Sequence, residues 1–419
     1  MNPLANKIIL LGITGSIAAY KAADLASKLA QSGAQVHAIL TEAATRFVAP
    51  LTFQSVTGQR AYTDADLWGS EAHVLHIGLA HKADLLCIAP ASATTLAKLA
   101  HGIADNLLSL TALAYFREAS STPLLLAPAM DAGMFEHPAT QENVRILAQR
   151  GSLFCGPEAG HLASGLVARG RMSEPADILG RVRYTLSRGG PWQGKRVVVT
   201  AGGTQEPIDP VRYLTNRSSG RQGYALAQAA LDAGAEVTLI TTPTALTPPS
   251  GAQVMAVRSA AEMQFAVLEA CASAYALCMA AAVADFRPAH PAEQKIKKGG
   301  GLPALVLERT ADVLAEVKAQ REKLGFPQIV VGFAAETEDL LSNAQAKLRQ
   351  KGLDLIVAND VSAHDAGFEV DTNRVILLWA DGRQETLPLL TKAEVAERII
   401  DTLCYQSPNP PTSGAAFRP

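Results

Sequence analysis

The sequence predicts an α/β protein built from two Rossmann-like domains in tandem. Two stretches carry this prediction, one from Lys7 to Leu40 and one from Lys195 to Thr241. Each runs from an apolar strand pattern through a glycine loop into an alanine-rich helix pattern and then into a second strand pattern, which is the order of a βαβ unit. Both helix patterns end at a glycine that opens a similar strand, Gly33-Ala-Gln-Val36 and Gly234-Ala-Glu-Val237.

The element patterns of the first half follow one another with the spacing of a single domain. Strands are expected at residues 7–11, 36–40, 83–89 and 124–127, with a break at Pro90, and helices at residues 17–31 and 175–187. The glycine-rich connector at residues 188–194 then marks the expected boundary. We therefore expect a first domain over residues 1–188, a second over residues 189–405, and a disordered tail at residues 406–419, which is rich in Pro, Ser and Gly.

Composition argues against several classes of protein. The 419 residues are 48% hydrophobic, enough for two cores, and the net charge of −2 gives no reason to expect a nucleic acid or an anionic membrane as partner. The five cysteines are odd in number and lack metal-ligand spacing, so we expect reduced thiols of a cytoplasmic protein. No secretory signal precedes Lys7, and no apolar run reaches the ~20 residues of a membrane span.

Small hydroxyl residues gather where two of the expected strands end. Thr41 follows the strand at residues 36–40, and Ser92, Thr94 and Thr95 follow the strand at residues 83–89 and open a helix. Hydroxyls and free backbone N–H groups at a helix start suit a phosphate group or the edge of a flat ring. The same residues would also serve as ordinary helix caps, so the pattern alone leaves both interpretations open.

Five motifs of the first half resemble those of the homo-oligomeric flavin-containing cysteine decarboxylases, which have a flavodoxin-like fold. In chain order they are Gly15-Ser-Ile-Ala-Ala-Tyr-Lys21, His76-Ile77, Pro90-Ala-Ser-Ala-Thr-Thr95, Asp105-Asn-Leu-Leu108 and Pro128-Ala-Met130. The resemblance implies an FMN cofactor, held by Gly15, Ser16, Thr41, Ser92, Thr94, Thr95, Asp105, Asn106 and Met130. It also implies that His76 is the catalytic histidine near the flavin. In such enzymes the flavin oxidises the thiol side of a cysteine-derived carboxylate to a thioaldehyde, which stabilises the carbanion left when CO₂ departs.

Two further candidate catalytic residues depart from the pattern of that family. Asp131 stands where the family has an asparagine that contacts the substrate carboxylate, and two carboxylates 4 Å apart repel by ~4 kcal/mol at an effective dielectric of 20. Asp131 is therefore expected to be protonated when substrate binds, to meet it through a cation, or to point elsewhere. Residues 162–172 resemble the flap that covers the substrate in this family. Ser164 stands where that flap often presents a cysteine as proton donor, and a hydroxyl is a far weaker acid than a thiol with a pKa of ~8.5.

These departures leave two interpretations of the first domain. In one, decarboxylation persists, with Ser164 closing the flap and water or another group delivering the proton. In the other, the first domain has lost its activity and only binds flavin, so that the chain acts as a ligase alone.

Six motifs of the second half resemble phosphopantothenate-cysteine ligase. They lie at residues 202–212, 216–220, 279–286, 295–298, 331–337 and 358–360. From about Lys7 to Cys404 the chain is thus similar to the bifunctional coenzyme A biosynthesis proteins, which fuse this ligase behind the decarboxylase. The resemblance implies that CTP with Mg²⁺ activates the carboxylate of 4′-phosphopantothenate as an acyl-cytidylate, which the amine of cysteine attacks. The first domain would then decarboxylate 4′-phosphopantothenoylcysteine to 4′-phosphopantetheine.

The residue types of these motifs also suit nucleotidyl transfer without the resemblance. Activation of a carboxylate by a nucleotide requires cations around a triphosphate. Lys295, Lys297 and Lys298 form a basic cluster beside the triglycine at residues 299–301, although a lysine run is also common on a solvated face. Neither first loop carries a P-loop motif, so a P-loop ATPase is not expected.

The resemblance assigns roles to individual residues of the second domain. Lys295 would stabilise charge during attack on the α-phosphate, Asn216 would hold the acyl-cytidylate, and Arg212 would position the phosphorylated substrate. Lys347 and Lys351 are spaced i, i+4, which places both on one face of a helix. The residues implied for CTP are Met279, Ala280, Ala281, Asp285, Lys295, Ala311, Asp312, Val313, Leu314, Phe333, Lys347 and Lys351, with Ala311 in place of the family's proline.

The resemblance further implies a homo-oligomer. The flavin family forms trimers with FMN near subunit contacts and the ligase pairs as dimers, which together imply a dodecamer. Tandem Rossmann units alone would equally suggest an NAD(P)-dependent oxidoreductase. That alternative requires a G-x-G-x-x-G loop and an acidic residue after the second strand, where this chain has Thr41 and Thr241.

Overall fold

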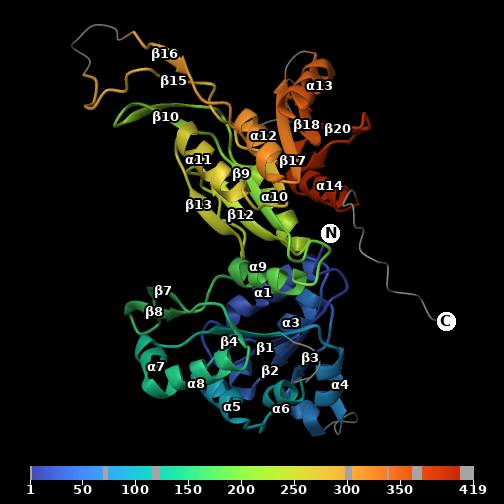
Figure 1. The fold of residues 1–419 in the computed structure, drawn as a ribbon. Helices are drawn as coiled ribbons and strands as arrows, with labels where there is room; N and C mark the ends of the chain where they lie inside the picture. Colours follow the sequence, from blue (N-terminus) through green and yellow to red (C-terminus); the bar gives the residue numbers. More distant parts are fainter. Residues whose placement is uncertain are drawn as a thin grey trace, which may run out of the picture. The chain divides into compact units, whose positions relative to one another are not determined.

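A computed structural model describes residues 2–68, 74–115, 123–297, 304–336, 339–360 and 370–405 (Figure 1). The chain divides into two compact units, residues 2–186 and a second unit that begins at Ser187. The tail predicted at residues 406–419, and Lys298 of the predicted basic cluster, lie outside the described residues. Among the described helices, none has both the length and the apolar content of a membrane span.

The first unit is built on a six-stranded parallel sheet in the order β3-β2-β1-β4-β5-β6. Its strands are β1 (Ile8–Ile13), β2 (Gln35–Leu40), β3 (Ala61–Thr63), β4 (Leu85–Ala91), β5 (Leu124–Pro128) and β6 (Leu153–Phe154). The strand order changes direction between β1 and β4. This switch point leaves a crevice beyond the carboxyl ends of the strands, where doubly wound sheets bind ligands.

Helices cover both faces of this sheet because alternate strand side chains are buried on opposite sides. Ile9 and Leu11 of β1 pack with α1 (Ala19–Gln31), α3 (Pro50–Thr57) and α9 (Pro175–Ser187). Leu10 packs on the other face with α4 (Leu75–Lys82), α5 (Ala93–His101), α6 (Leu107–Ala114) and α8 (Pro138–Gln149). The remaining elements are α2 (Glu42–Thr45), the 3₁₀ turn η1 (Asp64–Trp68), α7 (Ala132–Glu136) and a hairpin of β7 (Glu158–His161) and β8 (Val167–Arg171).

The second unit has an eight-stranded sheet in the order β13-β12-β9-β14-β17-β18-β20-β21. Its strands are β9 (Arg196–Ala201), β12 (Glu236–Thr241), β13 (Gln253–Ala256), β14 (Ala276–Met279), β17 (Ile329–Glu336), β18 (Leu355–Asp360), β20 (Val375–Trp379) and β21 (Gln384–Thr386). The first six strands of that order are parallel. Strand β20 is antiparallel to β18, and β21 is antiparallel to β20. The direction of the strand order again changes at the first strand, between β9 and β14.

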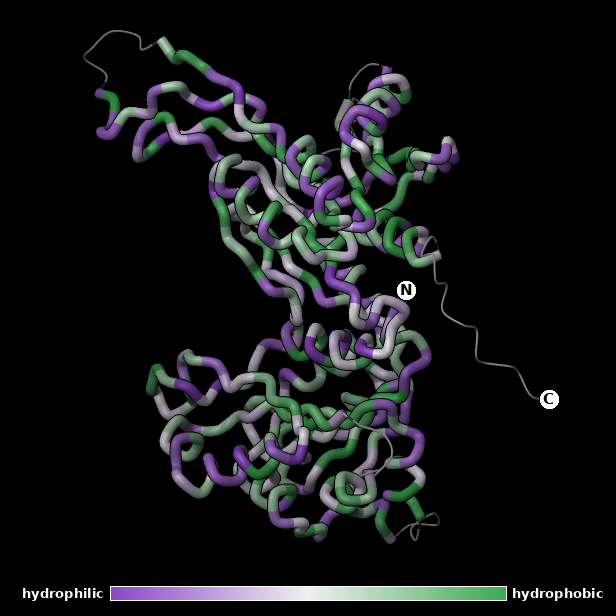
Figure 2. Tube along the Cα trace, in the orientation of Figure 1, coloured by the Kyte–Doolittle hydropathy of each residue, from purple (hydrophilic) through white to green (hydrophobic). Residues whose placement is uncertain are grey.

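In the described part of the second unit, five helices flank the sheet and short strand pairs extend from it. The helices are α10 (Arg221–Asp232), α11 (Ala260–Cys271), α12 (Val313–Leu324), α13 (Leu340–Lys351) and α14 (Lys392–Tyr405). Residues of α11, α12 and α13 share one buried cluster with the sheet, and α10 packs against α14. The pairs are β10 (Gln205–Asp209) with β11 (Arg212–Thr215), β15 (Phe286–Pro288) with β16 (Leu307–Arg309), and β19 (Thr372–Asn373) with β22 (Leu390–Thr391). Figure 2 shows hydrophobic stretches along the central strands and mixed polarity along the helices.

The predicted fold class is confirmed, since both units are doubly wound α/β sheets. Two details add to the expectation or differ from it. Strand β4 continues past Pro90 to Ala91 with a register shift against β5, so the expected break is a local irregularity within the strand. The polar stretch between β9 and α10, for which no strand is predicted, contains the β10–β11 hairpin.

Helix α10 packs directly on β9 because Gly223 has no side chain. A Cβ at this position would lie 2.6 Å from the carbonyl oxygen of Thr200.

Candidate active sites

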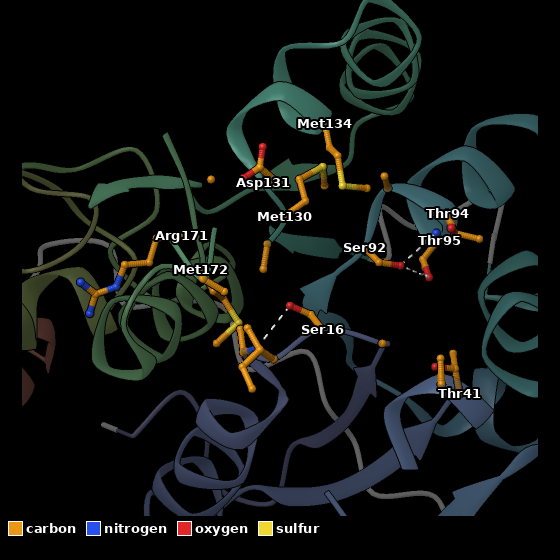
Figure 3. Close-up of a pocket in the computed structure, with 18 of the residues that line it drawn as sticks. Ser16, Thr41, Ser92, Thr94, Thr95, Met130, Asp131, Met134, Arg171 and Met172 are labelled. Atoms are coloured by element: carbon orange, nitrogen blue, oxygen red, sulfur yellow. Dashed lines mark hydrogen bonds between the residues drawn. The ribbon is translucent and has the colours of Figure 1, made fainter. Parts of the chain in front are cut away.

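A cavity of about 850 Å³ lies at the carboxyl ends of β1, β2, β4 and β5 in the first unit (Figure 3). Because parallel strands all end at this edge, motifs that are far apart in the sequence meet here. All nine residues predicted for FMN and both departing residues line it: Gly15, Ser16, Thr41, Ser92, Thr94, Thr95, Asp105, Asn106, Met130, Asp131 and Ser164.

Several of these residues are helix caps as well as cavity lining. The Ser92 hydroxyl accepts a hydrogen bond from the backbone N–H of Thr95 at 3.3 Å and donates one to the Thr95 hydroxyl at 3.1 Å. Thr41 caps α2 in the same way, and Asn106 forms a capping box with Ser109 at the start of α6. The two interpretations left open by the sequence are therefore compatible, because the caps place hydroxyls at helix starts that face the cavity.

The lining of the cavity combines the surfaces that a flat ring with an anionic tail would need. Ile17, Met130 and Met134 supply apolar surface. Hydroxyls of Ser16, Thr41 and Ser92 line other parts of the wall (Figure 3). The loop after β1 approaches α2 so closely that a Cβ on Gly15 would lie 2.6 Å from the Cβ of Ala43. A larger residue at position 15 would have to displace this wall.

Three cationic side chains of this cavity were not predicted. The Lys98 amine lies 2.8 Å from Asp105, and mainly because Lys98 donates this hydrogen bond, the pKa of Asp105 is lowered from its ordinary value. Lys21 lies 2.8 Å from Glu174, which also pairs with Arg171. Lys98 follows Thr95 by three residues in the predicted helix, so its position on the cavity side of that helix could have been read from the sequence.

Asp131 and Ser164, the two residues that differ from the family pattern, contact each other. Ser164 lies in the turn between β7 and β8, and its hydroxyl donates a hydrogen bond of 2.5 Å to Oδ2 of Asp131. The other carboxylate oxygen of Asp131 accepts the backbone N–H of Gly133 at 3.0 Å. The hairpin is fixed against the loop after β5, because the Met130 N–H donates to the carbonyl oxygen of Gly170 at 3.0 Å. Of the positions considered for Asp131, the structure shows the side chain turned toward the flap.

His76 does not line this cavity. It lies on α4, half-buried, and its Nδ1 atom is buried without a hydrogen-bond partner among the described residues. The expectation that His76 stands beside the bound flavin is therefore not met by the cavity of a single chain.

A second cavity, of about 860 Å³, lies at the carboxyl ends of β14 and β17 in the second unit. The starts of α10 and α12 contribute to its wall. Twelve predicted residues line it: Asn216, Met279, Ala280, Ala281, Asp285, Ala311, Asp312, Val313, Leu314, Phe333, Lys347 and Lys351. The second unit thus repeats the relation between fold and cavity found in the first.

The loop after β14 is held in place by side chains from four segments. Thr200 accepts the N–H of Ala281 at 3.0 Å, and Thr204 accepts the N–H of Ala284 at 2.9 Å. Thr310 donates to the carbonyl oxygen of Ala284 at 2.6 Å. The Asn216 amide nitrogen donates to the carbonyl oxygens of residues 282 and 283 at 3.3 and 3.2 Å. The three threonines were not predicted as site residues. Thr204 belongs to the motif at residues 202–212, whereas Thr200 and Thr310 resemble ordinary strand and loop residues in the sequence.

Two lysines of α13 lie along one side of the second cavity. Lys347 donates a hydrogen bond of 2.8 Å to the carbonyl oxygen of Phe333, and Lys351 forms an ion pair with Asp312, the N-cap of α12. Partial burial alone would raise the pKa of Asp312, but hydrogen bonds from Lys351 and the N–H of Ala315 lower it below its ordinary value. The carboxylate therefore stays ionised and keeps the Lys351 ammonium group in position.

Arg212 and Lys295, both predicted as catalytic, do not line the second cavity. Arg212 opens β11, and its guanidinium donates to the carbonyl oxygen of Ile296 at 3.0 Å. Buried Asp209 accepts the N–H groups of residues 211, 212 and 296 at 2.8, 2.9 and 3.2 Å. The segment that carries Lys295 is thus folded onto the β10–β11 hairpin, which is the physical reason for the difference from the expectation.

The second cavity also contains polar residues that were not predicted as site residues, although Arg217 and Asn359 lie in the motifs at residues 216–220 and 358–360. Arg217, Arg221, Asn359 and Lys392 belong to its lining, and Oδ1 of Asn359 is buried without a hydrogen-bond partner in the described part of the chain. Burial lowers the pKa of Lys392, and nearby Arg221 lowers it further. Within the described residues, no group of three or more His, Cys, Asp and Glu side chains is arranged to hold a metal ion.

The fold and the two cavities define a class of α/β protein with two nucleotide-sized sites, each at the switch point of a doubly wound sheet. Comparison with protein families gives each unit a match. Residues 2–187 match the family described as Flavoprotein, and residues 192–405 match the DNA/pantothenate metabolism flavoprotein C-terminal domain.

Full-length relatives carry both units in one chain. The chain is 45% identical over 407 residues to the coenzyme A biosynthesis bifunctional protein CoaBC of Bacillus subtilis, covering 96% of this chain and 98% of the relative. It is 44% identical over 409 residues to CoaBC of Mycobacterium tuberculosis strain H37Rv, covering 95% and 96%.

Solved structures resemble the units one at a time. The crystal structure of the C-terminal domain of a CoaBC is 40% identical, covers 51% of this chain and 96% of its own, and has a TM-score of 0.44. A mutant PPC decarboxylase complexed with pantothenoylaminoethenethiol is 34% identical, covers 43% and 98%, and has a TM-score of 0.39.

The chain belongs to the CoaBC family of bifunctional coenzyme A biosynthesis proteins. It is a flavoprotein enzyme with decarboxylase and ligase activities. Two alternatives are accordingly not favoured, namely an NAD(P)-dependent oxidoreductase and a ligase whose flavin-binding half has lost activity.

Proposed function

We propose that residues 189–405 join cysteine to 4′-phosphopantothenate at the expense of CTP, and that residues 1–188 decarboxylate the resulting 4′-phosphopantothenoylcysteine to 4′-phosphopantetheine. One observation carries this proposal: each unit gathers most of its family-like motifs around a single cavity at a sheet switch point. The product of the ligase is the substrate of the decarboxylase, which gives the fusion a chemical reason. A reduced, cytoplasmic protein agrees with the composition.

In the ligase unit, two lysines of α13 and the loop after β14 support the proposal. Lys347 and Lys351 provide cationic charge for the phosphates of CTP, which would bring Mg²⁺ with them, while the loop at residues 279–285 presents backbone groups to the nucleotide. Asn216 contacts this loop and lines the same cavity, so it is well placed to hold the acyl-cytidylate while the cysteine amine attacks. No protein metal site is required, because Mg²⁺ commonly binds through substrate phosphates.

In the decarboxylase unit, the residues around the first cavity fit FMN. Ser16, Thr41 and the Ser92–Thr95 segment offer hydroxyls and helix starts for polar groups, and Met130 offers apolar surface for the ring. Bound FMN supplies the oxidation of the substrate thiol and the later return of the same two electrons. The chain supplies orientation, exclusion of water by the β7–β8 flap, and protons.

We propose further that the active form is a homo-oligomer, a dodecamer by resemblance, in which three predicted residues act across subunits. His76, Arg212 and Lys295 all lie outside the cavity of their own unit. His76 would face the flavin of a neighbouring copy, and the segment with Arg212 and Lys295 would close over the nucleotide of a dimer partner.

Mixed assemblies test the proposed function and the sharing of residues together. Chains with His76→Asn and chains with Gly15→Val are co-expressed with different tags and purified through both tags. Each variant alone should lack CO₂ release from 4′-phosphopantothenoylcysteine, whereas the mixed assembly should regain part of it because some sites combine an intact cavity with an intact histidine. A mixed assembly as inactive as its parents would contradict the shared site, and an inactive yellow wild-type protein would contradict the decarboxylase function.

A further inference from the structure

We propose that Asp131 and Ser164 together form the proton donor that completes the decarboxylase reaction, with Asp131 storing the proton and Ser164 passing it to carbon. The inference rests on the proposed function and names the group that replaces the missing thiol. Three observations support it: the contact between the two side chains, their shared cavity, and the absence of any cysteine from the described lining of that cavity.

The geometry joins the two residues into one unit. The Ser164 hydroxyl donates to Oδ2 of Asp131 at 2.5 Å, which is at the short limit for a hydrogen bond between a hydroxyl and a carboxylate. The opposite oxygen of Asp131 is held by the N–H of Gly133, so the carboxylate cannot turn away without losing the cap of α7. Asp131 therefore has one oxygen fixed on backbone and one directed at the flap.

Asp131 and Ser164 take no part in the ion pairs that line the cavity. Lys21 and Arg171 both face Glu174, and Lys98 faces Asp105. His161 on β7 is the remaining titratable group of the flap that lines the cavity. Within the described residues, no ion pair joins Asp131 to a cation, and its side chain contacts the Ser164 hydroxyl and the Gly133 N–H.

The proton balance of the reaction gives Asp131 a source and an acceptor. Bound FMN would take a hydride from the carbon that bears sulfur, and the Asp131 carboxylate would accept the S–H proton. The bond to the carboxylate then breaks, CO₂ leaves, and the electron pair remains on carbon and sulfur as an enethiolate. Ser164 gives its O–H proton to that carbon while Asp131 gives its own proton to the Ser164 oxygen. The hydride returns to the carbon bonded to sulfur, and solvent protonates the thiolate.

This arrangement gives Ser164 a stronger acid from which to recover its proton. A serine alone is too weak an acid to protonate the enethiolate, but a serine that is re-protonated by a carboxylic acid in the same motion is not limited in this way. The two departures from the family pattern thus compensate each other.

Product analysis tests the proposal with the full-length flavin-containing protein. CO₂ release and the ratio of saturated thiol to enethiol are measured anaerobically from 4′-phosphopantothenoylcysteine. We expect wild type to give one saturated thiol per CO₂. Ser164→Ala and Asp131→Asn should each retain flavin and release CO₂ in a first turnover, but form saturated thiol about 100-fold more slowly, so that enethiol accumulates. The Asp131→Asn variant keeps the cap of α7, because an asparagine oxygen accepts the same N–H.

Two further variants separate proton transfer from positioning of the flap. Ser164→Cys combined with Asp131→Asn restores the family's thiol and amide and should restore saturated product. Ser173→Ala removes another hydroxyl–carboxylate hydrogen bond of the hairpin, 3.0 Å to Glu158 and outside the cavity, and should leave the product ratio unchanged. Saturated thiol at the wild-type ratio from both single variants would overturn the relay. Absence of CO₂ from the flavin-loaded wild type would instead contradict the proposed function itself.

Discussion

The Lys347 amine lies 2.8 Å from the carbonyl oxygen of Phe333, which fixes a cation at the carboxyl end of β17 beside the second cavity. One turn further along α13, Lys351 is paired with the N-cap residue Asp312. Both ammonium groups are thus positioned before any nucleotide binds. Such preorganisation is how cations stabilise phosphoryl and nucleotidyl transfer at little cost in reorganisation.

Removal of the Lys347 charge should weaken the response to CTP. We expect Lys347→Met to raise the KM for CTP by about tenfold, as for the loss of one charge-assisted hydrogen bond. Steady-state pyrophosphate release measures the effect. The matched control is Lys318→Met, because Lys318 also faces a backbone carbonyl, that of Gln350 at 3.4 Å, but lies outside the cavity. Equal KM values for the two variants would show that Lys347 has no special part in nucleotide binding.

Asn216 should act on the second half of the ligase reaction. Its amide spans the carbonyl oxygens of residues 282 and 283, so Asn216→Ala removes the group that faces the predicted acyl-cytidylate without touching the lysines. We expect formation of the acyl-cytidylate to continue and transfer to cysteine to slow by about 100-fold. Rapid-quench detection of the intermediate before and after addition of cysteine separates these steps. If both steps slow equally, Asn216 only holds the loop in place and has no separate part in the transfer to cysteine.

The close approach at Gly15 should be required for flavin binding. A side chain at this position meets the Cβ of Ala43 at 2.6 Å, so Gly15→Val has to displace the wall of the first cavity. We expect the purified variant to hold about tenfold less flavin than wild type, as measured by its absorbance. Gly189→Ala is the control, because a Cβ there meets no atom within 4 Å. Wild-type flavin content in Gly15→Val would contradict the assignment of this cavity.

His37 on β2 should make the stability of the chain sensitive to mild acid. Burial lowers the pKa of His37 below its ordinary value of 6.5, and the charge of Lys82 lowers it further. The unfolded chain therefore binds a proton near pH 6.5 that the folded chain does not, so stability is full above this pH and is lost as the pH falls through the folded-state pKa.

Thermal unfolding at pH 7.5 and 5.5 tests the role of His37. Tm should fall less for His37→Gln than for wild type over this interval, while exposed His161→Gln should behave like wild type. Equal falls for wild type and His37→Gln would show that this histidine does not couple folding to protonation.

The sequence predicts the cavity linings well because their residues sit in short motifs at strand ends, and parallel strands bring those ends together. Ser92 and Met279 are examples, since each directly follows or ends a buried strand. What could not be predicted depends on contacts between distant segments. The bond between Asp209 and the N–H of Ile296 spans 87 positions and carries Lys295 away from its own cavity. Likewise, Ser164 and Asp131 are 33 positions apart, so no local sequence pattern indicates that they contact each other.

We propose that one chain activates phosphopantothenate with CTP and then decarboxylates the ligated product with flavin. The most direct measurement follows pyrophosphate and CO₂ together in a single preparation supplied with 4′-phosphopantothenate, cysteine, CTP and Mg²⁺. We expect a yellow protein that releases the two products in equal amounts, with neither product formed when CTP is omitted. Pyrophosphate without CO₂, or a colourless protein that is indifferent to CTP, would contradict the account.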